Sequence, residues 1–298
     1  MIVDRTKLQA ELAELGDEYP FTGKLFDTGH GLMHYLDEGS GPVLVMVHGN
    51  PTWSFFWRKL VKAFRGNHRI IVPDHLGCGL SDKPQDWSYT LDNHARNLEA
   101  LLKHLGVDKA TLLVHDWGGS IGNLWAARNP DKVRGLVAMN TAAFRSSLMP
   151  WPIGLCRIPF FGKLAIRGFN AFAWAATRTT TLKPLPAAIR RGFLIPYRSW
   201  EERIATHQFV VDIPRQEGDR SWAALVETEA GLKQYLSKPV LLPWGMADWC
   251  FCPRFLAEWQ RHLPQAELHK FEAGHYLMED QGERVETCIR QFLDKHRL

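Results

Sequence analysis

Buried strand segments and helical segments alternate along this chain, and the alternation breaks only once. Short apolar runs such as Val43–Val47 are typical of strands whose sheet is covered on both faces, whereas Leu98, Leu101, Leu102 and Leu105 recur at helical spacing. Expected strands are 32–37, 43–47, 68–73, 110–114, 133–139, 240–244 and 267–271, and expected helices are 54–64, 93–105, 119–128, 255–262 and 283–295. Alternation with short links predicts an α/β fold with a doubly wound, mostly parallel sheet.

The break begins near Phe144 and lasts about 80 residues. This stretch holds no convincing strand; it is apolar, rich in Arg and punctuated by seven prolines between Pro150 and Pro214. We therefore predict a core of residues 1–143 and 230–298 and a helical cap of residues 144–229. An insertion at this point lies over the carboxyl ends of the strands, where open α/β sheets bind ligands. Six aromatic residues of the cap are candidates to line an apolar cavity, although they could equally form the cap's own core: Phe160, Phe161, Phe169, Phe172, Trp174 and Phe193.

Composition excludes several other classes of protein. The net charge of +4 is small and scattered, so a nucleic-acid-binding face is not indicated. Five cysteines without paired spacing indicate neither a disulfide framework nor a zinc site, and we expect no metal and no cofactor. No window reaches the roughly 18 apolar residues that span a bilayer. The segment 1–5 lacks the apolar stretch of a signal peptide and is typical of a short amphipathic helix, so we expect a cytoplasmic enzyme.

The segment from Leu112 to Ser120 is the strongest catalytic candidate. It runs from a buried strand through a turn of small residues into a helix, which is the context of a nucleophile elbow, and Asp116 occupies the nucleophile position. Gly118 and Gly119 permit the tight turn, and the helix N-terminus favours an ionised carboxylate. An Asp at this position can also be a simple helix cap.

Two other segments supply partners for Asp116 in the expected order. His275 follows the last strand in the run Glu272–His275, and Asp248 follows the strand 240–244. The strand 133–139 leads into Met139-Asn140-Thr141, which offers no acid. The order Asp116, Asp248, His275 is the nucleophile–acid–histidine order of the α/β-hydrolase fold.

An Asp nucleophile restricts the chemistry. A serine that attacked an sp³ carbon would form an ether, which water does not readily cleave, whereas a carboxylate forms an ester that a His-activated water can open. Asp116 therefore indicates alkyl transfer or the opening of a strained ring. Asp248 would orient His275 and stabilise its imidazolium.

Asn50 and Trp117 are candidates to stabilise the leaving group. Asn50 lies in the loop after the strand 43–47, where this scaffold places its oxyanion hole, and Trp117 follows the nucleophile. An amide and an indole N–H that converge in a dry pocket suit a halide or a carboxylate oxygen. The alternatives are turn chemistry before Pro51 for Asn50 and plain packing for Trp117.

Three motifs together resemble the haloalkane dehalogenase branch of the α/β-hydrolases: His48-Gly49-Asn50-Pro51-Thr52-Trp53, Asp74–Pro84 and His115-Asp116-Trp117-Gly118-Gly119. The resemblance covers nearly the whole chain, and its Asn and Trp pair matches Asn50 and Trp117. Epoxide hydrolases differ, because they usually carry an aromatic residue at the Asn50 position and two cap tyrosines. This chain offers Tyr197 and Tyr235 for that role.

Within the branch, the cap runs 191–197 and 212–214 and the run 244–251 are more similar to the OleB-type β-lactone decarboxylases of bacterial olefin biosynthesis. This likeness implies a cis-3,4-dialkyl β-lactone as substrate, a cis-alkene and CO₂ as products, and assembly with other enzymes of that pathway. A haloalkane dehalogenase, an epoxide hydrolase or a non-catalytic receptor on the same fold remain alternatives. The role of His275 stays open, because alkene formation needs no water.

Overall fold

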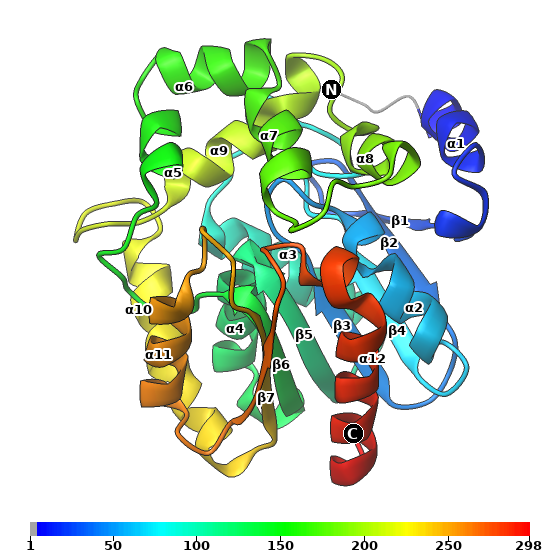
Figure 1. The fold of residues 1–298 in the computed structure, drawn as a ribbon, viewed down its shortest axis with the longest axis vertical. Coiled ribbons are helices and arrows are strands. Elements are labelled where there is room, and N and C mark those ends of the chain that lie inside the picture. The colour runs from blue at the N-terminus through cyan, green and yellow to red at the C-terminus, as the bar shows by residue number, and fades with distance from the viewer. Residues whose placement is uncertain (1–4) are drawn as a thin grey trace.

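A computed structural model describes residues 5–298 of the chain. Its centre is an eight-stranded sheet in the order β1-β2-β4-β3-β5-β6-β7-β8 (Figure 1). Strand β2 runs antiparallel to β1 and β4, and all the other neighbours pair in parallel. This arrangement confirms the predicted fold class. The strands are β1 Lys24–Asp27, β2 Leu32–Glu38, β3 Val43–Val47, β4 Arg69–Pro73, β5 Ala110–Asp116, β6 Val133–Thr141, β7 Val240–Gly245 and β8 Glu267–Phe271.

Helices cover both faces of the sheet, and each face has its own apolar core. Leu44 and Met46 of β3 point into one core, and Val45 and Val47 point into the other, so that the strand is buried on both sides. One layer contains α2 Arg58–Phe64 and α12 Leu277–His296; the other contains α3 Leu91–His104, α4 Trp117–Arg128, α10 Trp222–Gly231 and α11 Pro253–His262. Helix α1, Arg5–Ala13, packs Leu8 and Leu12 against the first core.

The observed elements differ from the expected ones mainly at their ends. Strand β1 was not expected, and its alternation is weak because it lies at the exposed edge of the sheet. Strands β5 and β6 continue to Asp116 and Thr141, and α12 begins at Leu277 rather than at Glu283. The helix expected at 54–64 is a 3₁₀ turn followed by α2. The amphipathic helix expected at 1–5 lies outside the described residues except for its last position.

The region between β6 and β7 is helical, and its helices α5 to α9 stand over the carboxyl ends of the strands (Figure 1). The helix α10 crosses the expected boundary at residue 229 and packs against α4 of the core, so the division at that residue stays a prediction. Among residues 5–298, no helix has the length and apolar character needed to cross a membrane. The cap helices are α5 Trp151–Cys156, α6 Phe161–Lys163, a π turn Leu164–Gly168, α7 Ala171–Thr179, α8 Ala187–Leu194 and α9 Ile204–Asp212.

A buried ion pair joins α2 to the start of α12. The Arg58 guanidinium is completely buried and donates to both carboxylate oxygens of Glu279, at 2.5 and 3.0 Å, and to Glu18 at 2.9 Å. Burial raises the pKa of Glu279, but the charges of Arg58 and Lys59 outweigh that effect and lower it. Because Glu279 lies four residues after His275, the pair also fixes the segment that carries this histidine.

We expect Arg58→Met to lower the free energy of unfolding by about 3–5 kcal/mol, because it leaves Glu279 buried with only Lys59 as a partner. Urea unfolding measures this loss. The matched control is Arg96→Ala, which breaks an exposed pair with Asp92 and should cost less than about 1 kcal/mol. Equal effects of the two substitutions would contradict the structural role of the buried pair.

Candidate active site

Asp116 ends β5 in a strained turn, and α4 begins at the next residue. Its backbone has φ 52° and ψ −128°, a conformation that residues other than glycine rarely adopt. The turn depends on close backbone contacts that only glycine allows. A Cβ on Gly118 would lie 2.0 Å from the Val47 carbonyl oxygen, and one on Gly119 would lie 1.8 Å from the Thr141 hydroxyl. This geometry is that of a nucleophile elbow.

The Asp116 carboxylate is buried and faces a cavity, not the end of its helix. The backbone N–H of Asn50 donates to its Oδ1 at 2.6 Å, the N–H of Trp117 also stabilises the carboxylate, and the Asp116 side chain makes no N-cap hydrogen bond within the described part of α4. Burial raises the pKa of Asp116, and the charge of His275 and the N–H groups of Asn50 and Trp117 offset part of that rise. The side chain is therefore placed to react rather than to cap.

His275 lies between the two predicted acids. Its Nδ1 is 2.8 Å from Asp248 Oδ2, and its Nε2 is 3.7 Å from Asp116 Oδ2. Burial lowers the pKa of His275, but the charge and hydrogen bond of Asp248, together with the charge of Asp116, outweigh it and raise the pKa. The structure thus brings Asp116, Asp248 and His275 together, with Asp248 on the imidazole side that faces away from Asp116.

Asn140 is a part of the site that the sequence analysis missed. It sits near the end of β6 at φ 38°, and its Nδ2 donates to Asp248 Oδ2 at 2.9 Å and to the Gly245 carbonyl at 3.0 Å. Its Oδ1 accepts the Gly245 N–H at 2.8 Å. The run Met139-Asn140-Thr141 contains no acid, but an amide at the end of a strand that borders the site is a signal for such a partner. Asn140 holds Asp248 in the orientation that contacts His275.

We expect Asn140→Ala to lower kcat by about ten- to a hundredfold, because Asp248 loses a hydrogen bond to its charged oxygen. The pH–rate profile should also shift, because Asp248 raises the pKa of His275, and the His275 charge in turn lowers the pKa of Asp116. Steady-state kinetics across pH measures both effects. Asn129→Ala removes an amide that donates to Trp125, far from the site, and should change neither. An unchanged profile in the Asn140 variant would contradict this role.

Asn50 and Trp117 both line the cavity beside Asp116. The Asn50 side-chain amide donates one hydrogen bond to the Thr206 carbonyl of α9, at 3.1 Å, so it also ties the cap to the core. Its second N–H is not used in that bond. The Trp117 ring packs against Phe209 of α9 at 5.1 Å. The two predicted donors therefore lie at one cavity, where both also contact the cap.

The cavity has a volume of about 400 Å³ and lies between the core and the cap. Its lining is mainly apolar, with Asp116, Asn50 and His275 among its few polar groups. The prediction that six cap aromatics line it was only partly correct. Phe161 and Phe172 do, whereas Phe193 is buried against Phe55 and Tyr276. The other three point to solvent, with exposed fractions of 88% for Phe160, 74% for Phe169 and 52% for Trp174.

Comparison with known proteins agrees with this geometry. The family described as "alpha/beta hydrolase fold" matches residues 42–281. The chain belongs to the α/β-hydrolase family.

Two curated relatives bear the name cis-3-alkyl-4-alkyloxetan-2-one decarboxylase. The relative from Shewanella oneidensis is 43% identical over 92% of this chain and 89% of its own length. The relative from Xanthomonas campestris pv. campestris is 43% identical over 94% of this chain and 98% of its own length.

Among solved structures, a haloalkane dehalogenase from Bradyrhizobium elkani is similar to this chain with a TM-score of 0.84 and 27% identity. The alignment covers 93% of this chain and 99% of that one. Both resemblances expected from the motifs are thereby confirmed: the overall structure is that of the dehalogenase branch, and the higher sequence identity is to the decarboxylases.

Proposed function

We propose that this α/β-hydrolase decarboxylates cis-3-alkyl-4-alkyloxetan-2-ones to cis-alkenes and CO₂. The observation that carries the proposal is the 43% identity, over more than nine-tenths of the chain, to two proteins of that name. The site is compatible with this chemistry, because a buried carboxylate at a nucleophile elbow faces a largely apolar cavity. Asp116 is the proposed nucleophile.

In the first step, an oxygen of Asp116 attacks ring carbon C4, and the bond between C4 and the ring oxygen breaks. The electron pair of that bond stays on the released carboxylate, while relief of ring strain drives the step. Attack occurs from the face opposite the leaving oxygen, so C4 inverts. The second N–H of Asn50 and the indole N–H of Trp117 are the proposed donors to the released carboxylate, and such donors act strongly in a site that excludes water.

In the second step, the bond from C3 to the carboxylate carbon breaks, and its electron pair forms the C3–C4 double bond. The ester bond between C4 and Asp116 breaks at the same time, which regenerates the Asp116 carboxylate and releases CO₂. Inversion followed by anti elimination converts a cis lactone into a cis alkene. No water is consumed. His275, held by Asp248, supplies positive charge beside Asp116 and thereby keeps the carboxylate ionised.

A haloalkane dehalogenase is the second candidate, and the similarity of the fold to the Bradyrhizobium enzyme favours it. In that reaction His275 would activate a water to open the ester on Asp116. The epoxide hydrolase alternative has less support. Tyr197 donates to the Thr52 carbonyl at 3.2 Å and Tyr235 is buried elsewhere, so neither is among the residues that line the cavity.

The proposal also covers the cellular location of the enzyme and the pathway in which it acts. We place the enzyme in the cytoplasm, in the biosynthesis of long-chain olefins, where it would assemble with other enzymes of the pathway. The helices of residues 144–229 act in this proposal as the cap that closes the cavity over the substrate. Asn50 supports this role, because its side-chain amide joins the loop after β3 to α9.

The test offers the purified protein a long cis-3,4-dialkyl β-lactone and a 1-bromoalkane in water enriched in ¹⁸O. We expect cis-alkene to form at a kcat/KM well above that of halide release. Mass spectrometry of the peptide that contains Asp116 provides a second measurement. Decarboxylation leaves the carboxylate unlabelled after many turnovers, whereas hydrolysis of an ester inserts solvent oxygen into it. Halide release as fast as alkene formation, with a labelled Asp116, would assign the chain to the dehalogenases.

A further inference from the structure

The outer face of the cap exposes large apolar side chains that the cap's own packing leaves uncovered. We define the cap face by six residues on α5, α6 and α7 and on the links between them: Trp151, Ile158, Phe160, Phe161, Phe169 and Trp174. Their exposed fractions are 75, 47, 88, 56, 74 and 52%. Contiguous apolar surface of this kind marks an interaction site. We propose that the cap face docks onto an anionic lipid surface.

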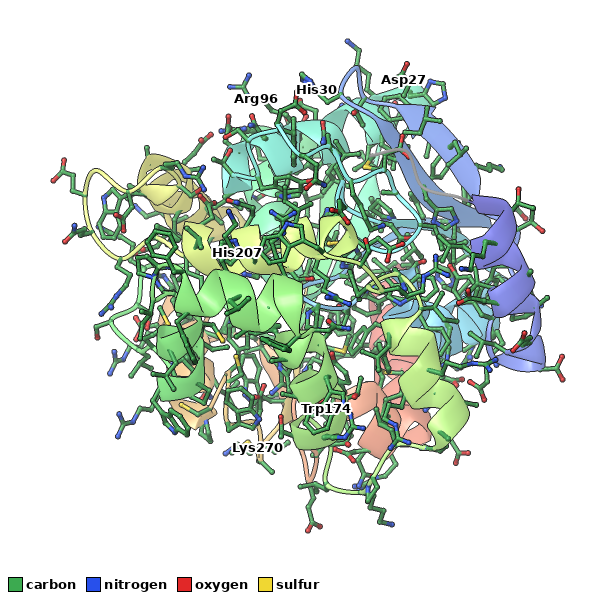
Figure 2. All side chains as sticks on the ribbon, turned by 90° about the horizontal axis from the view of Figure 1, so that it is seen from above. Asp27, His30, Arg96, Trp174, His207 and Lys270 are labelled. Atoms are coloured by element: carbon green, nitrogen blue, oxygen red, sulfur yellow. The ribbon has the colours of Figure 1, made fainter. Side chains whose placement is uncertain are left out.

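The arrangement of these residues is continuous over the cap. Trp151 begins α5, Ile158 lies two residues after the end of that helix, and Phe160 and Phe161 follow at the turn into α6. Phe160 has φ 63°, so a strained backbone conformation holds the most exposed aromatic ring of the chain outward. The elements from α5 to α7 pack against one another in sequence, and Figure 2 looks down on them, with Trp174 labelled on α7.

The positive charge of the cap indicates that the surface onto which it docks is anionic. Residues 151–200 contain eight Lys or Arg and not one Asp or Glu, whereas the other 248 residues contain 28 basic and all 32 acidic residues. Lys163, Arg178 and Lys183 are exposed on this segment. The Arg178 guanidinium lies 3.7 Å over the Trp174 ring, so a cation accompanies the exposed aromatic. Aromatic and apolar groups among Lys and Arg, without acids, are typical of surfaces that lie in the headgroup region of anionic membranes.

The cap face is continuous with the cavity. Trp151 and Phe161 are exposed and also line the cavity that contains Asp116. Docking would therefore bring an apolar entrance to the lipid. This last step rests on the proposed function, since a dialkyl lactone and its alkene product both partition into a bilayer. The lipid-binding surface itself does not depend on that function.

The test is co-sedimentation of the whole protein with vesicles of phosphatidylcholine alone or of phosphatidylcholine mixed with phosphatidylglycerol. We expect binding to the mixed vesicles, weakened by added salt. One double variant, Phe160→Ser with Phe169→Ser, removes exposed rings, and another, Lys163→Glu with Arg178→Glu, reverses charge. Each should weaken binding by about tenfold or more, since several buried methylenes or several cation contacts are lost.

Two control variants each remove an exposed apolar side chain or reverse a charge outside the cap face. Leu236→Ser alters a side chain that is 54% exposed on the core, and Lys109→Glu alters an exposed loop cation. Both should bind vesicles as the original protein does. The residues substituted in the double variants do not line the cavity, so alkene formation from a short-chain, water-soluble cis-lactone should be unchanged in all four variants and shows that each is folded.

Three results would overturn the lipid proposal. They are failure of the protein to bind mixed vesicles, equal binding by the double variants, and a dimer or a complex with another pathway enzyme that the double variants dissociate without lipid. Failure of the proposed function has a different signature. In that case the short-chain lactone yields no alkene from any form of the protein, while vesicle binding and its loss in the double variants persist.

Discussion

Asp116→Asn should lower turnover of the lactone by about 10⁴-fold or more, because an amide of nearly the same shape is a poor nucleophile. The substitution should not destabilise the protein. Burial of the charged carboxylate raises the pKa of Asp116, so the neutral amide avoids the cost of burying that charge. Alkene formation and thermal unfolding of freshly purified variant measure the two effects.

The same change at Asp131, which is exposed in the link before β6, serves as the control and should leave activity intact. Full activity of the fresh Asp116 variant would refute the nucleophile assignment. A slow return of activity on storage has a different meaning, because deamidation restores Asp at this position. Mass spectrometry of the peptide distinguishes that recovery from activity of the amide itself.

The sequence carried most of the information about the core and about the order of the site residues. Strands β3 and β8 match the expected bounds, and β5 ends at the residue identified as the nucleophile. These positions are predictable because a buried parallel strand needs a continuous apolar run and an elbow needs small residues after it. Both requirements are local, so a single sequence displays them.

What the sequence did not reveal depends on contacts between distant segments. Asn140 matters because β7 brings Gly245 and Asp248 beside it, and nothing near Asn140 in the chain indicates that pairing. The direction of Phe160, Phe169 and Trp174 was also not predictable. The cap helices are short and separated by prolines and turns, so no long periodic pattern tells the inner face from the outer one.

His275→Gln should separate the two candidate reactions, because each needs the histidine in a different protonation state. Hydrolysis of an ester on Asp116 needs a neutral imidazole, so haloalkane turnover rises only as pH passes the raised pKa of His275. Lactone decarboxylation needs an ionised Asp116 and no base. In the unsubstituted protein, lactone turnover should therefore persist at acidic pH, where haloalkane turnover has already fallen.

In the variant, haloalkane turnover should stop after one halide per protein, a loss of about 10³-fold or more in steady state. Lactone turnover responds differently. The His275 charge lowers the pKa of Asp116, so its removal lets that pKa rise further, and less of the carboxylate is ionised at neutral pH. Activity on the lactone should consequently fall at neutral pH and recover, to within about tenfold, at alkaline pH.

The exposed His269 of β8 provides the control, since His269→Gln should alter neither reaction. The measurement is rate against pH for both substrates, with halide counted per protein in the first turnover. Equal loss of both activities at every pH would mean that His275 acts as a base in the lactone reaction as well, and would exclude the mechanism without water. Halide release that continues past one equivalent would show that another group activates water, and His275 would then lose its proposed role in both reactions.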